Sequence, residues 1–174
     1  MAFDIQVPQD VVFRTRRETD RSPGFEWHDL NYDEVFKGRR VVVFALPGAW
    51  TPTCSSTHLP GYDALAPELK KAGIDDIYCL SVNDSFTMNA WFNHLDVKNV
   101  KPLPDGSGEF TRKMGMLVRK DNLGFGDRSW RYSMIVNDGV VEMLWVEPGL
   151  CDNAQDDPFE VSDVNTMLEW LGNE

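Results

Sequence analysis

The chain lacks the features that would direct it into a membrane, through a secretory pathway or onto a nucleic acid. No apolar run approaches the roughly 18 residues of a membrane-spanning helix, and the first ten residues have neither the basic nor the apolar region of a signal peptide. Acidic residues outnumber basic ones, 28 to 17, whereas nucleic-acid-binding domains usually carry a basic patch. We therefore expect a cytoplasmic protein that binds neither membranes nor nucleic acids.

Cysteine is scarce, and the cysteines that exist do not form pairs in the sequence. The three residues Cys54, Cys79 and Cys151 contain no CxxC spacing. An odd number of widely spaced cysteines argues against a disulfide framework, and the lack of closely spaced ligands argues against a structural zinc site. We expect reduced thiols, no metal and no cofactor.

What the chain does contain is an alternation of apolar strands and helices. The runs 40–47 and 76–82 are rich in β-branched and aromatic residues, which is typical of strands buried on both faces of a sheet. A helix from about residue 54 to 71 is expected between them, closed by Gly73. The remaining predictions are an opening strand over 10–17, a turn plus irregular chain over 21–30, short helices over 31–38 and 108–115, a helix over 84–96, and a loop over 100–108.

The C-terminal part reads as a hairpin followed by a helix. Residues 131–147 form two strand patterns joined by Asn137, Asp138 and Gly139, and Asp-Gly favours tight hairpin turns. Residues 161–171 have an apolar stripe at helical spacing. Together these elements predict one α/β domain over 1–174 with a thioredoxin-like fold, in which helices flank a mixed central sheet and the N-terminal segment is an addition.

Cys54 lies between the first buried strand and the helix, at a position that favours a thiolate. Free backbone N–H groups and the helix dipole both stabilise the ionised sulfur at a helix N-terminus. A free thiol of pKa about 8.5 is only about 3% ionised at pH 7, and a shift of 2.5 units takes about 3.4 kcal/mol. A dipole supplies at most about 2 kcal/mol, and residues 41–63 contain no Lys or Arg. A cation from elsewhere in the chain is therefore expected beside Cys54.

The residues around Cys54 predict a small pocket of hydrogen-bond donors. Pro47 restricts the backbone, and Gly48 permits close approach of a ligand. The Thr51 hydroxyl and the backbone N–H of Thr53 are expected to face a substrate with two adjacent oxygens. The alternative is that Cys54 is a small buried apolar residue and that the threonines are helix caps.

The segment around Cys54 resembles the active-site motif of a known family. The segment "PGAWTPTCSSTHLPGY" resembles the peroxidatic motif Pro-x-x-x-Thr-x-x-Cys of peroxiredoxins, in particular the type II, or peroxiredoxin-five, class. Further stretches that resemble this class are 79–84, 131–141 and 146–148. Three others, 108–118, 124–134 and 157–168, are especially similar to the peroxiredoxin part of bacterial peroxiredoxin–glutaredoxin hybrids. The similarity extends over nearly the whole chain after about residue 10.

The resemblance implies a thiol peroxidase that reduces hydrogen peroxide and alkyl hydroperoxides. Cys54 would be the peroxidatic thiolate, which becomes a sulfenic acid. The family's active-site arginine maps onto Arg131, with Arg128 as a nearby competitor for that role. Thr51 would contact the peroxide, and Pro47 would shield the pocket from water.

The resemblance also implies partners. An external thiol reductant, either glutathione with glutaredoxin or thioredoxin, would regenerate the cysteine, and Cys151 is a candidate resolving cysteine because some members carry one in a similar loop. A homodimer is expected, with Trp50 and the helix 86–91 at its interface. The chain departs from the hybrids because it contains no glutaredoxin domain, and from the family because Trp50 stands where phenylalanine is usual.

Two other interpretations of Cys54 stay open from the residues alone. A thiol–disulfide oxidoreductase would require CxxC, but Thr51 occupies the position of its other cysteine. A non-enzymatic peroxide sensor would use the same thiolate.

The remaining candidate residues have structural interpretations. Cys79 is expected to be a core residue. His58 lies on the same helix face as Cys54 and is expected to pack or hydrogen-bond, with tuning of the site as the alternative. Pro60 and Gly61 predict a distorted turn near the start of the helix.

Overall fold

The structure, a computed structural model, describes residues 4–173 and contains a five-stranded mixed sheet. Residues 1–3 and 174, the two ends of the expected domain 1–174, lie outside the described residues. The strand order is β5-β4-β3-β8-β9. The parallel strands are β3 (Arg40–Ala45), β4 (Asp76–Ser81) and β5 (Lys101–Pro104), and the antiparallel hairpin consists of β8 (Tyr132–Asn137) and β9 (Val140–Val146).

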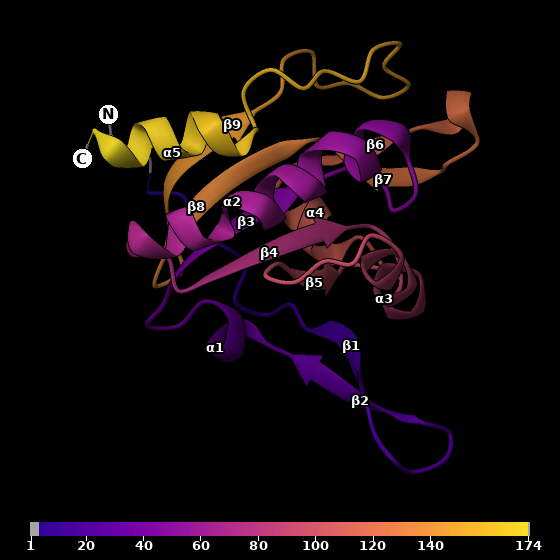
Figure 1. Cartoon of the computed structure of the whole chain (residues 1–174). Helices are drawn as coiled ribbons and strands as arrows, with labels where there is room; N and C mark the ends of the chain where they lie inside the picture. The colour runs from indigo at the N-terminus through magenta and orange to yellow at the C-terminus, as the bar shows by residue number, and fades with distance from the viewer. Residues whose placement is uncertain (1–3, 174) are drawn as a thin grey trace.

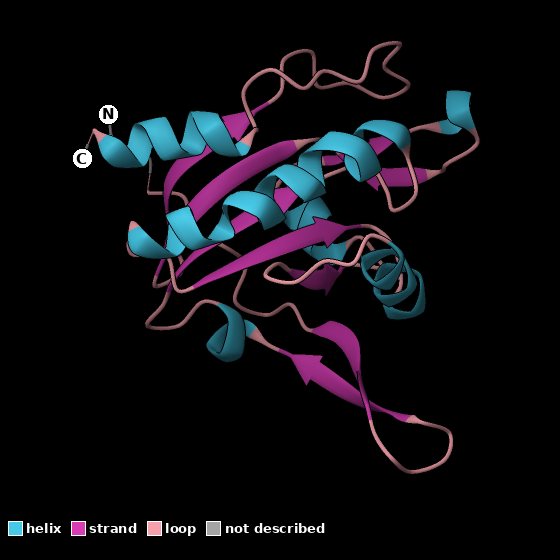
Figure 2. Ribbon diagram, in the orientation of Figure 1, coloured by secondary structure: helices cyan, strands magenta, loops and turns pink. Residues whose placement is uncertain are grey.

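Helices cover both faces of this sheet (Figures 1 and 2). Successive residues of β3 alternate between two cores: Val42 and Phe44 pack with one set of helices, and Val41 and Val43 pack on the opposite face. The first face is covered by α2 (Leu59–Lys71), α3 (Ser85–His94) and α5 (Val164–Gly172), and the second by α1 (Tyr32–Val35) and α4 (Glu109–Lys113). The predicted mixed sheet with helices on both faces is confirmed.

The predicted helix ends follow from capping side chains. Asn31, Asp84 and Asp163 each accept a hydrogen bond from a backbone N–H in the first turn of α1, α3 and α5. Gly73, just past α2, has φ of 94°, in the left-handed region that favours glycine. In the β8–β9 hairpin, Asp138 and Gly139 have φ of 48° and 80°, as the Asp-Gly turn predicted.

The prediction of a turn followed by irregular chain over 21–30 is correct for the turn at 21–24 and wrong for the rest. Residues Phe25–Leu30 form β2, which pairs antiparallel with β1 (Phe13–Glu18) in a hairpin that stands away from the central sheet (Figure 1). The hairpin is held by aromatic contacts rather than by a regular apolar alternation. Phe25 and Phe86 have ring centroids 5.2 Å apart, and the Arg16 guanidinium lies 4.5 Å from the Phe86 centroid.

The prediction of a loop over 100–108 is also wrong in part, because β5 lies within it. Pro102 and Pro104 suggested a loop, since proline cannot donate to a β-ladder. However, β5 is the edge strand of the sheet and pairs only with β4. An edge strand needs only one side of its backbone for pairing, so it tolerates these prolines.

The distorted turn expected near Pro60 is present as a π-helix over Cys54–His58. Proline has no N–H and its ring clashes with the carbonyl four residues earlier, so a regular α-turn is unfavourable at this point. Instead, the Leu59 N–H bonds to the Cys54 carbonyl, one residue further back than in an α-helix.

A second small sheet lies beside the main one and was not predicted. It pairs β6 (Leu117–Arg119) with β7 (Asp127–Ser129) on either side of a 3₁₀-helix over Asp121–Leu123. This sheet leads directly into the short stretch Trp130–Arg131 and then β8. It therefore fixes the approach of the chain to the carboxyl-terminal end of β3.

Candidate active site

The sheet register brings two distant segments to the same edge. Ala45, at the end of β3, pairs with Tyr132, at the start of the antiparallel strand β8. The segment after β3 leads to Cys54, and the residue before Tyr132 is Arg131. Because β3 and β8 run in opposite directions, the end of β3 lies beside the start of β8. Cys54 and Arg131, which are far apart in the sequence, therefore come together at this edge of the sheet.

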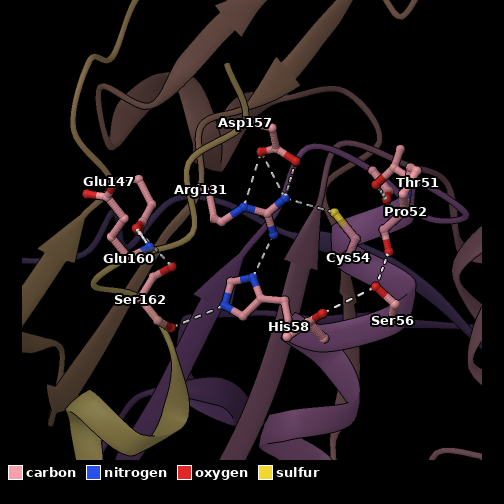
Figure 3. Close-up of polar contacts among 12 residues, drawn as sticks. Thr51, Pro52, Cys54, Ser56, His58, Arg131, Glu147, Asp157, Glu160 and Ser162 are labelled. Carbon is pink, nitrogen blue, oxygen red and sulfur yellow. Dashed lines mark hydrogen bonds and ion pairs between the residues drawn. The ribbon is translucent and has the colours of Figure 1, made fainter.

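Cys54 and Arg131 are both buried and in contact. The Arg131 Nη2 lies 3.4 Å from the Cys54 Sγ (Figure 3). Cys54 is fully buried, and Arg131 is 1% exposed. Burial works against the charged form of Arg131, but attraction to Cys54 and to Asp157 outweighs it, and the pKa of Arg131 is raised above its ordinary value. This is the cation that the electrostatic argument required.

His58 lies on the other side of the guanidinium. Its Nδ1 is 2.9 Å from the Arg131 Nη1, and its Nε2 is 3.2 Å from the Ser162 carbonyl oxygen. Arginine can only donate a hydrogen bond, and a carbonyl oxygen can only accept one. The His58 Nδ1 therefore accepts from Arg131, and its Nε2–H donates to Ser162. Burial and the neighbouring Arg131 charge hold the pKa of His58 well below its usual range. His58 is therefore a neutral ring that orients Arg131.

The loop before Cys54 has a constrained backbone. Trp50 has φ of 70°, in the left-handed region that a bulky residue rarely adopts, and its ring is half exposed against His94. The Thr51 hydroxyl donates to the Gly48 carbonyl at 2.8 Å, and the Ala49 N–H donates to Asn83 at 3.0 Å. These bonds fix the loop that places Thr51 three residues before the thiol.

Arg128, the competing cation, stands beside the same loop but has different partners. Its Nη1 donates to the Pro47 carbonyl at 3.3 Å, and its Nε donates to the Phe125 carbonyl at 3.1 Å. A side chain on Gly48 would meet the same Nη1 at 2.5 Å, so glycine leaves room for the guanidinium. Among the described contacts, it is Arg131 and not Arg128 that bonds to the Cys54 sulfur.

The structure places a buried arginine and a constrained Thr-x-x-Cys loop together at the end of β3. Known proteins resemble this chain in sequence and in fold. A family model described as Redoxin matches residues 26–168. A peroxiredoxin of Rhizobium etli is 55% identical over 174 residues, which cover 98% of this chain and 97% of that protein. This chain is a peroxiredoxin of the Redoxin family. The predicted family is therefore confirmed, and with it the activity of a thiol peroxidase.

Other relatives and solved structures agree with this identification. A hybrid peroxiredoxin, hyPrx5, of Haemophilus influenzae is 55% identical over 166 residues, which span 95% of this chain but 64% of that protein. The structure of a 1-Cys peroxiredoxin from Plasmodium falciparum matches with a TM-score of 0.91 and 33% identity, covering 99% of this chain and 100% of that one. The common fold is the thioredoxin-like fold of peroxiredoxins, as predicted.

The peroxiredoxin's two other cysteines lie in contrasting surroundings. Cys79, in β4, is fully buried, and burial together with the nearby Cys54 raises the pKa of its thiol well above the ordinary value. This agrees with the prediction of a core residue. Cys151 is exposed and lines a cleft of about 580 Å³ that also includes Trp130 and Asp157.

Within residues 4–173, every helix is too short or too polar to cross a lipid bilayer.

Two carboxylates near the candidate active site were not predicted from the sequence. Asp157 faces Arg131, with its two oxygens 3.0 and 2.9 Å from the Arg131 Nη2. Glu147 is 1% exposed and accepts hydrogen bonds from the backbone N–H groups of Glu160 and Val161. The chain has 28 acidic residues, so nothing in the pattern distinguished these two.

Proposed function

We propose that Cys54 is the peroxidatic cysteine and reduces hydrogen peroxide and alkyl hydroperoxides to water and alcohols. The thiolate attacks the terminal peroxide oxygen, so that an S–O bond forms as the O–O bond breaks. Sulfur is oxidised by two electrons to a sulfenic acid, and the leaving oxygen takes a proton to become water or an alcohol. The contact between the Arg131 Nη2 and the Cys54 Sγ at 3.4 Å carries this proposal.

The residues around Cys54 take complementary parts in this step. Because the Thr51 hydroxyl already donates to the Gly48 carbonyl, its oxygen is left to accept a hydrogen bond from the peroxide. Arg131 holds the thiolate and the leaving oxygen, where negative charge develops. The backbone N–H of Thr53 contacts the substrate at the turn, Gly48 leaves the space, and Pro47 keeps water out.

Mapping the oxidised residue tests the site assignment. The reduced protein is treated with one equivalent of hydrogen peroxide and a reagent specific for sulfenic acids, and the adduct is located by peptide mass spectrometry. We expect the adduct on Cys54, with Cys79 and Cys151 unmodified. An adduct confined to Cys151 would show that the exposed thiol, and not the buried one, reacts with peroxide.

We propose that a thiol from outside the chain, glutathione with glutaredoxin or thioredoxin, reduces the sulfenic acid. Support comes from the hybrid nature of the relative from Haemophilus influenzae and from the 1-Cys description of the Plasmodium falciparum protein. The second candidate is Cys151 as a resolving cysteine, favoured by its exposure. An intramolecular disulfide between Cys54 and Cys151 after peroxide treatment would assign regeneration to Cys151; a mixed disulfide with added glutathione would assign it to an external thiol.

We also propose a single-domain homodimer in the cytoplasm. Three free cysteines fit a reducing compartment. The exposed rings of Trp50, at 50%, and Phe86, at 44%, supply apolar surface for a second copy. The match to the Haemophilus influenzae hybrid spans 64% of that longer protein.

A further inference from the structure

The Arg131 guanidinium has a third partner besides Cys54 and His58. The Asp157 carboxylate lies 3.3 Å from Nε and 3.0 and 2.9 Å from Nη2 (Figure 3). A guanidinium is planar and carries its donors in a rigid fork. Contacts at Nε and Nη2 on one edge, and at Nη1 on the other, therefore fix the plane and the rotation of the whole group.

Nη2 is the atom that Asp157 and Cys54 share. It has two hydrogens, and the carboxylate can hold only one of them without leaving the bond geometry. The other hydrogen is then directed at the Cys54 Sγ, 3.4 Å away. The position of the carboxylate thus determines which way the second hydrogen points.

The segment that carries Asp157 is fastened to the site at several places. The Phe159 ring centroid is 5.6 Å from the Arg131 guanidinium carbon and 4.8 Å from the His58 ring. Three residues later, the Ser162 carbonyl accepts from His58. The buried Glu147 carboxylate holds this segment by the backbone N–H of Val161, at 2.8 Å.

The ion pair between Asp157 and Arg131 differs from an ordinary surface pair. Exposed pairs contribute little because both side chains are mobile and solvated. Here the Arg131 side chain is 1% exposed and the Asp157 side chain is 43% exposed, and the carboxylate is bidentate, the geometry that gives the strongest such pairs. Asp157 also lines the cleft that includes Cys151.

We propose that Asp157 is a positioning residue for the peroxidase reaction, which holds Arg131 so that one Nη2 hydrogen points at the Cys54 sulfur. The proposal rests on the proposed roles of Cys54 and Arg131. The carboxylate has a second effect of opposite sign, because its negative charge offsets part of the guanidinium's attraction for the thiolate. Asp157 thus improves the orientation of the donor at the expense of thiolate stabilisation.

The two effects can be separated with Asp157→Asn, which keeps the size and one acceptor oxygen but removes the charge. The background is Cys151→Ser, which removes the exposed thiol, while burial holds the pKa of the Cys79 thiol well above its ordinary value. Ultraviolet absorbance of the thiolate is followed against pH, and the rate constant with hydrogen peroxide is measured where Cys54 is fully ionised. We expect the titration midpoint to move to lower pH, while the rate constant falls about tenfold, as for one lost or misdirected hydrogen bond.

A loss of fold would lower the rate constant too, but it would not make the thiolate easier to form. Asp157→Ala, which removes both acceptor oxygens, is expected to lower the rate constant further with a similar midpoint. Asp156→Asn is the matched control, because among the described contacts the neighbouring Asp156 has no hydrogen bond or ion pair. This control is expected to keep both wild-type values.

The positioning role also requires that Asp157 act through Arg131. In an Arg131→Ala background, Asp157→Asn should leave the rate constant unchanged. The proposal is overturned if Asp157→Asn keeps the wild-type rate constant, if the midpoint moves to higher pH, or if the loss persists without Arg131. If the parent protein itself reacts no faster than free cysteine, the proposed function fails, while the thiolate titration still tests the contact.

Discussion

At the scale of single residues, the site is a chain of contacts that ends on one sulfur. The Ser162 carbonyl orients His58, His58 and Asp157 orient Arg131, and Arg131 contacts Cys54. This series of contacts supports the proposal that Cys54, although fully buried, is the nucleophile. A permanently charged guanidinium beside a sulfur favours its ionised form.

Replacing Arg131 tests the cation directly. Arg131→Ala should lower the rate constant with hydrogen peroxide at neutral pH by about 10²–10³-fold, the usual effect of losing one preorganised donor to a developing charge. Arg131→Lys keeps the charge but not the fork, and should recover only part of the loss. Stopped-flow measurement of peroxide consumption gives both values. An Arg131→Ala protein within about threefold of wild type would show that the guanidinium is structural.

His58 predicts how stability depends on pH. The buried ring stays neutral in the folded state, whereas in the unfolded chain it takes up a proton near pH 6.5. Because the unfolded state binds more protons, stability is fully present above that pH and is lost as pH falls. From pH 7.5 to 5.5, this group should lower the free energy of unfolding by about 1.4 kcal/mol.

Urea unfolding at the two pH values checks this contribution. In His58→Gln the difference between pH 7.5 and 5.5 should shrink by about the same 1.4 kcal/mol, even though the variant is less stable at both. His94→Gln, at an exposed histidine, is the control and should keep the wild-type difference. An unchanged difference in His58→Gln would mean that the buried ring accepts a proton.

At the scale of elements, strongly patterned segments were predictable and locally irregular ones were not. The strands β3 and β4 follow from unbroken apolar runs, and α5 from its apolar stripe. The strands β2 and β5 were missed because contacts with other elements, aromatic in one case and an edge position in the other, override their local sequence. Arg131 was found by resemblance to a family and not by any pattern.

The segment that follows β9 also shows where sequence reasoning ends. Asp157 and Glu147 act through contacts with residues far away in the chain, and neither has a spacing that marks it. Their contacts depend on how residues 148–160 leave β9 and return toward α5 (Figure 1). Only the tertiary structure brings the Asp157 carboxylate to Arg131.

The hydrogen bonds that the Glu147 carboxylate accepts from the backbone N–H groups of residues 160 and 161, here called the Glu147 clamp, can be tested by mutation. Glu147→Gln replaces a buried acceptor of two backbone N–H groups by a neutral amide, and should lower the free energy of unfolding by about 1–3 kcal/mol. Amide hydrogen exchange at residues 160 and 161 should become faster. Glu160→Gln, on the exposed side of the same segment, should change neither. Wild-type exchange in Glu147→Gln would exclude the clamp.

At the scale of the whole molecule, the exposed aromatic rings and the acidic surface have opposite effects on the association of two chains. A formal net charge of -11 favours separate, soluble chains. Trp50, Phe86 and Trp27 expose 50%, 44% and 60% of their surface, far more than large apolar rings usually do. The proposed homodimer would cover part of this surface next to the active-site loop.

Sedimentation equilibrium at micromolar concentration tests the dimer. We expect twice the mass of the chain for wild type and a shift toward monomer for Trp50→Asn, because asparagine tolerates the left-handed backbone at φ of 70° while removing the ring. Leu123→Asn removes another apolar side chain, 56% exposed, and should leave the mass unchanged. A wild-type mass of one chain would contradict the dimer.

The most direct test of the whole account is the rate at which the reduced protein consumes a substoichiometric amount of hydrogen peroxide in a stopped-flow instrument. We expect a second-order reaction far faster than that of free cysteine, which is lost in Cys54→Ser and retained in Cys79→Ser and Cys151→Ser. A wild-type rate close to that of free cysteine, or full activity in Cys54→Ser, would contradict the assignment of a buried thiolate activated by Arg131.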